Sequence, residues 1–237
     1  MASTGSVNLL SALVMKPALS ELADAFSHRT GQTLTIIYDA AGPIRDRIRN
    51  GEAFDATIVQ RQVLEMLAQE GAIEPDSVIT LARSGIAMAA HTGKPKPATK
   101  PVEALKQTLL AATSIAYPDP AIGHASGLQF QEVIERLGIS DTIRPKAKLM
   151  TGTLADFAMQ DEAEIAITQP MEILATPGYE LVGWLPPELQ DAKKFTWGAG
   201  VTTNSKEPDT ARALVRFLSS PAATSVIESW GMVPDGR

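Results

Sequence analysis

The sequence contains no cysteine, which excludes disulfide bonds, thiolate nucleophiles and cysteine-ligated metal sites. It also lacks any run approaching the ~18 consecutive apolar residues of a membrane span, so we expect no membrane insertion. A Gly-rich phosphate loop, a serine nucleophile elbow and a His/Asp/Glu cluster with metal-ligand spacing are all missing. The sequence therefore predicts neither a metal site nor a cofactor.

The N-terminal residues Met1–Ser6 have neither the basic segment nor the apolar segment of a signal peptide. Two interpretations stay open at this point. The sequence is a mature chain with a new initiating methionine, or the protein is cytoplasmic.

Basic residues are scattered, and the formal net charge is −6. The densest basic run, Arg45–Arg49, alternates with Asp46 and Ile48. Nucleic-acid binding needs clustered Lys and Arg, so nucleic acid is not an expected partner. A small anion stays possible as a ligand because a pocket sets its own local field. We expect a monomer.

Strand-like and helix-like segments alternate from end to end, and 237 residues are enough for two small domains. Such alternation predicts an α/β fold whose parallel sheets are covered by helices. The expected strands are 7–11, 34–38, 55–59, 114–117, 148–150, 164–168 and 179–184, with two longer extended runs at 79–90 and 195–202. The expected helices are near 19–26, 43–49, 61–69, 102–111, 126–137, 154–160, 209–218 and 221–230.

The two long extended runs are the only segments long enough to pass between two lobes. On this interpretation lobe 1 contains residues 1–82 and 200–237, lobe 2 contains residues 83–199, and a ligand cleft lies between them. The alternative is one larger open sheet, which would leave the proline-rich loops unexplained.

Four strand-to-helix turns carry small or polar residues. Ligands of α/β sheets sit at the carboxyl ends of strands, where helix N-termini offer unpaired N–H groups and a partial positive charge. Each turn taken alone is an ordinary N-cap, and Thr153–Asp156 resembles a capping box. Together they indicate an anion site. The four turns are Ser11–Ala12, Asp39–Pro43, Ala125–Gly127 and Thr151–Thr153.

The order of several short segments resembles bacterial molybdate-binding proteins. The segments are 7–12, 18–26, 30–31, 50–58, 137–139, 163–167 and 216–223, and they span nearly the whole chain. The resemblance implies the type II periplasmic-binding-protein fold, with two lobes joined by crossover strands near 80–90 and 195–203. It also implies capture of a small anion for an ABC transporter permease, and a periplasmic location.

Departures from that family concern the ligand. Molybdate binders that resemble this chain have serine where Val14, Ala40 and Ala41 stand, and tyrosine where Gln169 stands. A small organic carboxylate is therefore the expected ligand, rather than molybdate. The departures point to a branch that includes an aconitate isomerase, so the alternative function is cofactor-independent isomerisation of a small unsaturated polycarboxylate.

Two side chains are candidate bases for proton transfer, His124 and Asp39. Arg45 or Arg83 could bind a carboxylate bidentately. The ordinary alternatives are a solvated histidine, an aspartate that stabilises its turn, and surface ion pairs. The three tryptophans are expected to pack in the core. The predicted ligand-binding residues are Ser11, Ala12, Tyr38, Asp39, Ala41, Gly42, Arg45, Arg83, His124, Ser126, Gly127, Gly152, Thr153 and Gln169.

Overall fold

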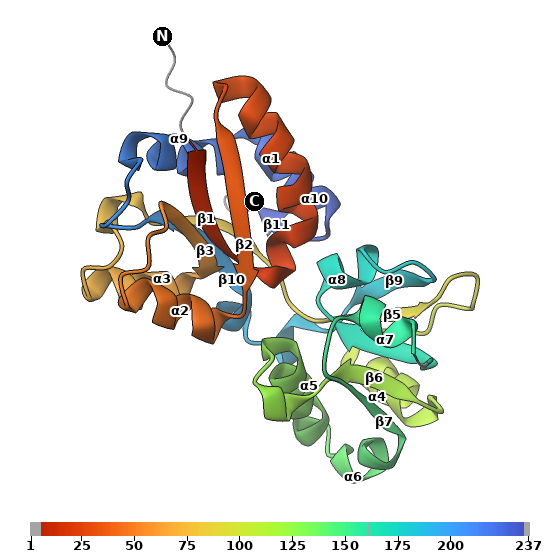
Figure 1. Cartoon of the computed structure of the whole chain (residues 1–237). Coiled ribbons are helices and arrows are strands. Elements are labelled where there is room, and N and C mark those ends of the chain that lie inside the picture. The colour runs from red at the N-terminus through yellow and green to blue at the C-terminus, as the bar shows by residue number, and fades with distance from the viewer. Residues whose placement is uncertain (1–5, 161, 235–237) are drawn as a thin grey trace. The chain divides into compact units, whose positions relative to one another are not determined.

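The computed structural model describes residues 6–160 and 162–234, which form two compact units (Figure 1). Unit 1 runs to Arg83 and resumes at Thr196, and unit 2 is Ser84–Phe195. The boundaries expected from the sequence were 82/83 and 199/200. Residues 1–5, on which the expectation for the N-terminal segment rests, lie outside the described residues.

Unit 1 is built on a six-stranded sheet of order β11-β4-β10-β3-β1-β2. The predicted parallel pairing is confirmed where β1 pairs with β2 and β3. The sheet as a whole is mixed, because β10 runs antiparallel to β3 and β4. The strands are β1 (Ser6–Ala12), β2 (Thr33–Asp39), β3 (Ala56–Gln60), β4 (Ile79–Arg83), β10 (Thr196–Val201) and β11 (Val233–Pro234).

Helices cover both faces of this sheet (Figure 1). The helix α1 (Lys16–Thr30) buries Leu19, Leu22 and Phe26, whose spacing forms one apolar stripe. Phe26 packs against Phe217 of α9, with ring centroids 5.6 Å apart, so α9 lies on the α1 side. The remaining helices are α10 (Pro221–Ser229), beside α1, and α2 (Ala41–Arg49) and α3 (Arg61–Gln69), on the opposite face; α9 spans Pro208–Leu218.

Unit 2 contains a five-stranded mixed sheet of order β7-β6-β8-β5-β9. Residues along its strands alternate between large and small. Ile115 and Tyr117 face a core of bulky residues, whereas Ala116 and Ala166 face a second core rich in alanine. This alternation allows helices to pack on both faces. The strands are β5 (Ala87–His91), β6 (Ile115–Pro118), β7 (Ala147–Met150), β8 (Ile165–Thr168) and β9 (Tyr179–Trp184).

Among the described residues of unit 2, five helices accompany this sheet, and two of them, α6 and α8, were not predicted. They are α4 (Val102–Ala111), α5 (Ala125–Arg136), α6 (Ser140–Ile143), α7 (Leu154–Ala158) and α8 (Pro170–Leu174). The single-turn 3₁₀ segments are Leu13–Met15, Pro75–Ser77, Pro120–Ile122, Arg144–Lys146, Pro187–Leu189 and Ala192–Phe195.

The extended run 79–90 is two strands rather than one. Its first half is β4 in the sheet of unit 1 and its second half is β5 in the sheet of unit 2. Between them, the backbone N–H of Ser84 donates to the carbonyl of Phe195 at 2.8 Å, which ties together the two segments where the chain changes sheets. The second extended run contributes β10 to unit 1 alone. Among the described residues, no helix combines the length and apolarity that a bilayer crossing requires.

Candidate functional site

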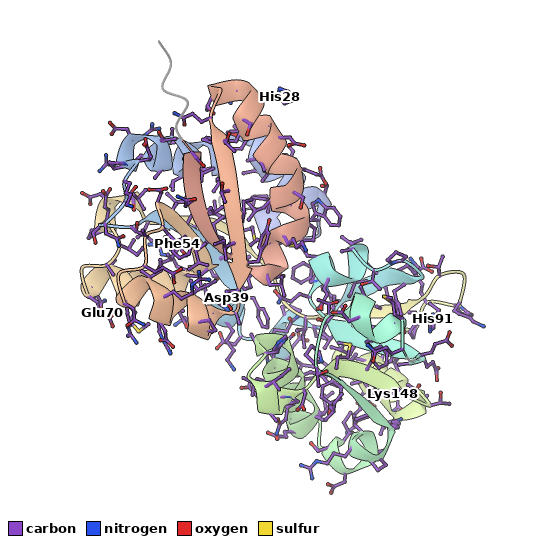
Figure 2. All side chains as sticks on the ribbon, viewed as in Figure 1. His28, Asp39, Phe54, Glu70, His91 and Lys148 are labelled. Carbon is purple, nitrogen blue, oxygen red and sulfur yellow. The ribbon has the colours of Figure 1, made fainter. Side chains whose placement is uncertain are left out.

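The predicted residues of unit 1 gather at the carboxyl ends of its parallel strands. Ser11 and Ala12 end β1, and they lie in register with Tyr38 and Asp39, which end β2. Figure 2 shows Asp39 at the end of the β2 arrow. Arg83 ends β4, which runs in the same direction as β3 because both are antiparallel to β10. The register therefore brings these five residues to one edge of the sheet.

The start of α2 offers unpaired donors at that edge. Ala40 is the N-cap residue and has no side chain that could accept a hydrogen bond, and the first turn contains no acidic residue. Among the described residues, the amides of Ala41 and Gly42 have no acceptor. Pro43 follows and has no N–H. Two backbone donors and the positive end of a nine-residue helix are thus available to an anion.

Two predicted site residues of unit 1, Asp39 and Arg45, pair with other charged side chains of the same unit. Asp39 accepts hydrogen bonds from the amide of Ala40 at 2.9 Å and from Arg47 at 3.3 Å. Arg45 pairs with its neighbour Asp46 at 2.8 Å on the exposed surface of α2. Both carboxylate oxygens of Asp39 therefore already accept hydrogen bonds, which makes Asp39 less available as a base.

Tyr38 faces α1, where Lys16 Nζ lies 6.0 Å from the centroid of its ring. Burial raises the pKa of Tyr38 above its ordinary value, although a hydrogen bond with Ser20 opposes that shift. The phenol is therefore neutral at physiological pH and can act as a hydrogen-bond donor or acceptor.

In unit 2 the start of α5 provides the second set of free donors. His124 is its N-cap residue but makes no capping bond, and the first turn again contains no acid. Within the described part of the chain, the amides of Ala125, Ser126 and Gly127 have no acceptor. The helix was expected to begin at Ser126, but it begins one residue earlier, and Ser126 is buried inside its first turn.

Gly127 explains how α5 comes so close to β6. A Cβ atom at this position would lie 2.1 Å from the carbonyl oxygen of Pro118, the last residue of β6. No side chain fits there, so glycine lets the helix start against the strand end. The three free amides are held at the carboxyl edge of the sheet for this reason.

The start of α7 is closed by the protein's own side chains. The predicted capping box is confirmed: Thr153 Oγ1 accepts from the amide of Asp156 at 3.1 Å, and Asp156 accepts from the amide of Thr153 at 3.0 Å. The amide of Leu154 donates to Glu172 Oε1 at 2.9 Å. Gly152 packs against Asp156. The amides of Thr153, Leu154 and Asp156 at the start of α7 therefore already have acceptors.

Glu172 was missed by the sequence analysis. It lies on α8 and its second carboxylate oxygen is hydrogen bonded to Thr168 Oγ1, at the end of β8. Burial raises the pKa of Glu172, outweighing the hydrogen bonds from Thr168 and Leu154 and the nearby charge of His124. The available signal was Pro170, which is suited to a first helical position and marks the start of α8.

Gln169 joins β8 to α8 as the N-cap residue of α8. Its side-chain oxygen is buried and has no hydrogen-bond partner. A buried polar atom without a partner carries an uncompensated desolvation cost, so this position is suited to a ligand or a water molecule. Its neighbour Thr168 is buried completely.

Unit 2 also contains an open pocket of about 450 Å³ between α5, α6 and β7. Its lining includes Tyr117, Ser140, Arg144 and Leu149. None of the predicted site residues contributes to it. Within residues 6–160 and 162–234, no three His, Asp or Glu side chains gather as the ligands of a metal ion would.

Comparison with known proteins gives a consistent result. The family model described as bacterial extracellular solute-binding protein matches residues 7–233. An aconitate isomerase from Pseudomonas sp. is 30% identical over 236 residues, covering 97% of this chain and 88% of the relative. The molybdate-binding protein ModA of Azotobacter vinelandii is 25% identical over 230 residues, covering 90% of this chain and 84% of that relative.

A solved structure shares the fold. The periplasmic molybdate-binding protein of Azotobacter vinelandii superposes with a TM-score of 0.77 at 20% identity, covering 96% of this chain and 98% of that one. This likeness confirms the type II periplasmic-binding-protein fold that the resemblance implied. The chain belongs to the family of bacterial extracellular solute-binding proteins.

Proposed function

We propose that the protein binds a small organic carboxylate through backbone amides at the starts of α2 and α5. One observation carries the proposal: these two helices begin at the carboxyl edges of the two sheets with neither a capping side chain nor an acidic residue in the first turn. The start of α7, by contrast, is occupied by Thr153, Asp156 and Glu172. Unpaired amides at helix N-termini are suited to carboxylate oxygens.

A carboxylate is favoured over molybdate because hydroxyl donors are missing. Val14, Ala40 and Ala41 stand where molybdate binders of this family have serine. Each absent hydrogen bond to a charged oxyanion removes roughly 1.5–3 kcal/mol of binding free energy. Two or three of them correspond to several powers of ten in affinity.

The two donor sets belong to different units. We propose that each set can bind a carboxylate group, and that the loaded protein delivers its ligand to an ABC transporter permease outside the cytoplasm. Membership of the extracellular solute-binding family supports this proposal.

A second candidate function is isomerisation of an unsaturated polycarboxylate, which is favoured by the 30% identity to an aconitate isomerase over nearly the whole chain. In such a reaction a base removes a proton from a carbon next to the double bond, the double bond shifts, and a proton returns to its far end. No co-reactant is needed. His124 is a better candidate base than Asp39, because both Asp39 oxygens already accept hydrogen bonds.

A thermal-shift screen of citrate, cis-aconitate, trans-aconitate and molybdate tests the proposal. We expect stabilisation by at least one tricarboxylate and little by molybdate. Proton NMR of the binding acid in heavy water then separates the two functions, since only an isomerase exchanges a C–H proton. The variant His124→Ala should abolish that exchange, while the matched control His28→Ala, at the end of α1, should not. Sub-micromolar molybdate binding, or no response to any tricarboxylate, would contradict the proposal.

A further inference from the structure

Cross-strand register brings four polar or aromatic side chains to one face of the unit 1 sheet. Ser11 lies opposite both Tyr38 and Ile58. Ile58 lies opposite Ala199, and Gln60 lies opposite Trp197 in the same unbroken register. Residues that are directly paired share a face, as do alternate residues along a strand. Ser11, Tyr38, Gln60 and Trp197 therefore point to the same side at the carboxyl edge.

That side is the one covered by α1. Tyr38 contacts Lys16, the first residue of α1. On the opposite face, a Cβ atom at Gly198 would lie 2.9 Å from Leu64 of α3. The side chains of Trp197 and Gln60 therefore point to the α1 side of the sheet rather than to the side on which α3 packs.

Two of these side chains carry buried polar atoms without a partner. Trp197 is 3% exposed, and its indole nitrogen makes no hydrogen bond. The side-chain oxygen of its cross-strand neighbour Gln60 is likewise buried and unpaired. Ser11 is fully buried, and its hydroxyl reaches only the adjacent carbonyl of Ala12 at 3.3 Å. Burial without a partner costs free energy at each atom.

Packing alone does not explain this arrangement. The indole N–H of Trp230 donates to Glu21 at 2.7 Å, so this chain does provide an acceptor for a tryptophan elsewhere. The ring of Trp197 is buried in the core, as expected, but its indole N–H has no hydrogen-bond acceptor. The oxygen and nitrogen of the Gln60 amide are interchangeable in assignment, so Gln60 can equally present an N–H₂ group.

We infer that Ser11, Gln60 and Trp197 form a subsite for one carboxylate group of the ligand. The indole of Trp197 donates to one oxygen, and the amide of Gln60 and the hydroxyl of Ser11 donate to the other. Gln60 is the more exposed residue of the pair that it forms with Trp197. Gln60 is also the N-cap residue of α3, whose first turn has no capping side chain and no acid. This inference rests on the proposed function.

Titration calorimetry with trans-aconitate compares the wild type with Trp197→Phe and Trp230→Phe. Loss of one charge-assisted hydrogen bond predicts roughly 10- to 100-fold weaker binding for Trp197→Phe. Trp230→Phe should bind as the wild type does. Without ligand, Trp197→Phe should unfold at the same temperature or higher, because it removes an unpaired N–H. A wild type that does not bind would defeat the proposed function; equal binding by wild type and Trp197→Phe would defeat only the subsite.

A second measurement remains decisive if Trp197→Phe fails to fold. In the double variant Trp184→Phe/Trp230→Phe, Trp197 is the only tryptophan and its fluorescence reports on the indole alone. Saturating trans-aconitate should shift its emission, and adding Gln60→Met should weaken binding about 10-fold. Unchanged emission at saturation, or unchanged affinity after Gln60→Met, would overturn the subsite.

Discussion

Asp55 in unit 1 and Glu172 in unit 2 are two carboxyl groups whose pKa values are shifted in opposite directions. Asp55 is 3% exposed and accepts hydrogen bonds at 2.8–3.1 Å from the amides of Asn8, Lys206 and Glu207 and from the hydroxyl of Ser205. Burial by itself raises the pKa of Asp55, but these four donors outweigh it and the pKa is lowered. Asp55 is therefore held as an anion.

Glu172 has fewer donors. Its carboxyl group meets the amide of Leu154 and the hydroxyl of Thr168, and burial leaves its pKa raised. The number of donors thus decides which protonation state burial favours. In unit 1 the carboxylate of Asp55, next to β3, accepts hydrogen bonds from amides of β1 and of the segment that precedes α9, and so holds these parts together. In unit 2 the carboxyl group closes α7 while keeping the ability to bind a proton close to His124.

Removing the charge of Asp55 should have the largest effect on stability. In Asp55→Asn an amide N–H₂ faces donors, so at least one buried amide loses its acceptor and a charge-assisted bond is lost. We expect a loss of about 3 kcal/mol in the free energy of unfolding, measured by urea denaturation. The exposed control Asp209→Asn, which breaks an ion pair with Arg212 at 3.1 Å, should cost under ~1 kcal/mol.

The pH dependence of that loss follows from the lowered pKa. A carboxyl group with a lowered folded-state pKa stabilises the fold above its unfolded pKa, which is about 3.9 for aspartate. The difference between wild type and Asp55→Asn should therefore shrink as the pH falls below about 4. A difference that stays constant down to pH 2 would contradict the assignment of Asp55 as the anion that holds these amides.

Glu172→Gln should give a smaller effect with the opposite pH dependence. Glutamine mimics the protonated acid, and a raised folded-state pKa means that the stabilising contribution is present below the unfolded pKa, about 4.3, and is lost as the pH rises. Near pH 4 the variant and the wild type should be equally stable. From there to pH 8 the variant should gain stability over the wild type, measured by thermal unfolding at a series of pH values.

A matched control for Glu172→Gln lies in the same unit. Glu180 pairs with Lys96 at 2.8 Å, and the hydrogen bond from Lys96 lowers its pKa. Glu180→Gln should therefore lose stability relative to the wild type as the pH rises above 4. If both variants changed in the same direction, burial would not be the cause of the raised pKa of Glu172.

Local patterns in the sequence were sufficient for most of the fold. The helices 61–69 and 102–111 were predicted with the bounds that α3 and α4 have. The five-residue helix α8 was not predicted, because five residues are too few to show a helical period and its N-cap residue Gln169 makes no capping bond. The helix α7 is equally short, but the capping box of Thr153 and Asp156 marked its start. Glu172 was missed with α8. The antiparallel placement of β10 was also missed, since pairing between distant segments leaves no mark in local periodicity.

The same limit applies to the candidate site. Ala41 and Gly42 were predicted as ligand-binding residues, although the helix was expected to begin at residue 43 and begins at Ala41. The hydrogen bond from the Leu154 amide of α7 to Glu172 could not be predicted, because it joins residues 18 positions apart on separate helices. The pairing of Gln60 with Trp197 depends on the register between β3 and β10. Side chains that act across strands are visible only once the register is known.

The smallest predicted effect concerns the open start of α2. The variant Ala40→Asn adds a side-chain acceptor for a backbone amide, as Asp55 does elsewhere in unit 1. The backbone of Ala40 (φ −77°, ψ 159°) is already that of an N-cap residue, so asparagine fits there. The new side-chain oxygen should accept from the amide of Gly42. We expect a gain of about 1 kcal/mol in the free energy of unfolding without ligand, measured by urea denaturation.

The reciprocal variant is Ser220→Ala, which removes an existing cap where Ser220 Oγ accepts from the amide of Ala223 at 3.4 Å on α10. It should lose about 1 kcal/mol and leave the affinity for trans-aconitate unchanged. Ala40→Asn should instead weaken that affinity, because the ligand then competes with an internal acceptor for the Gly42 amide. A stabilised Ala40→Asn protein that binds as well as the wild type would mean that the start of α2 does not hold the ligand. The free amides of α5 would then be the only ones of the two sets left to explain anion binding.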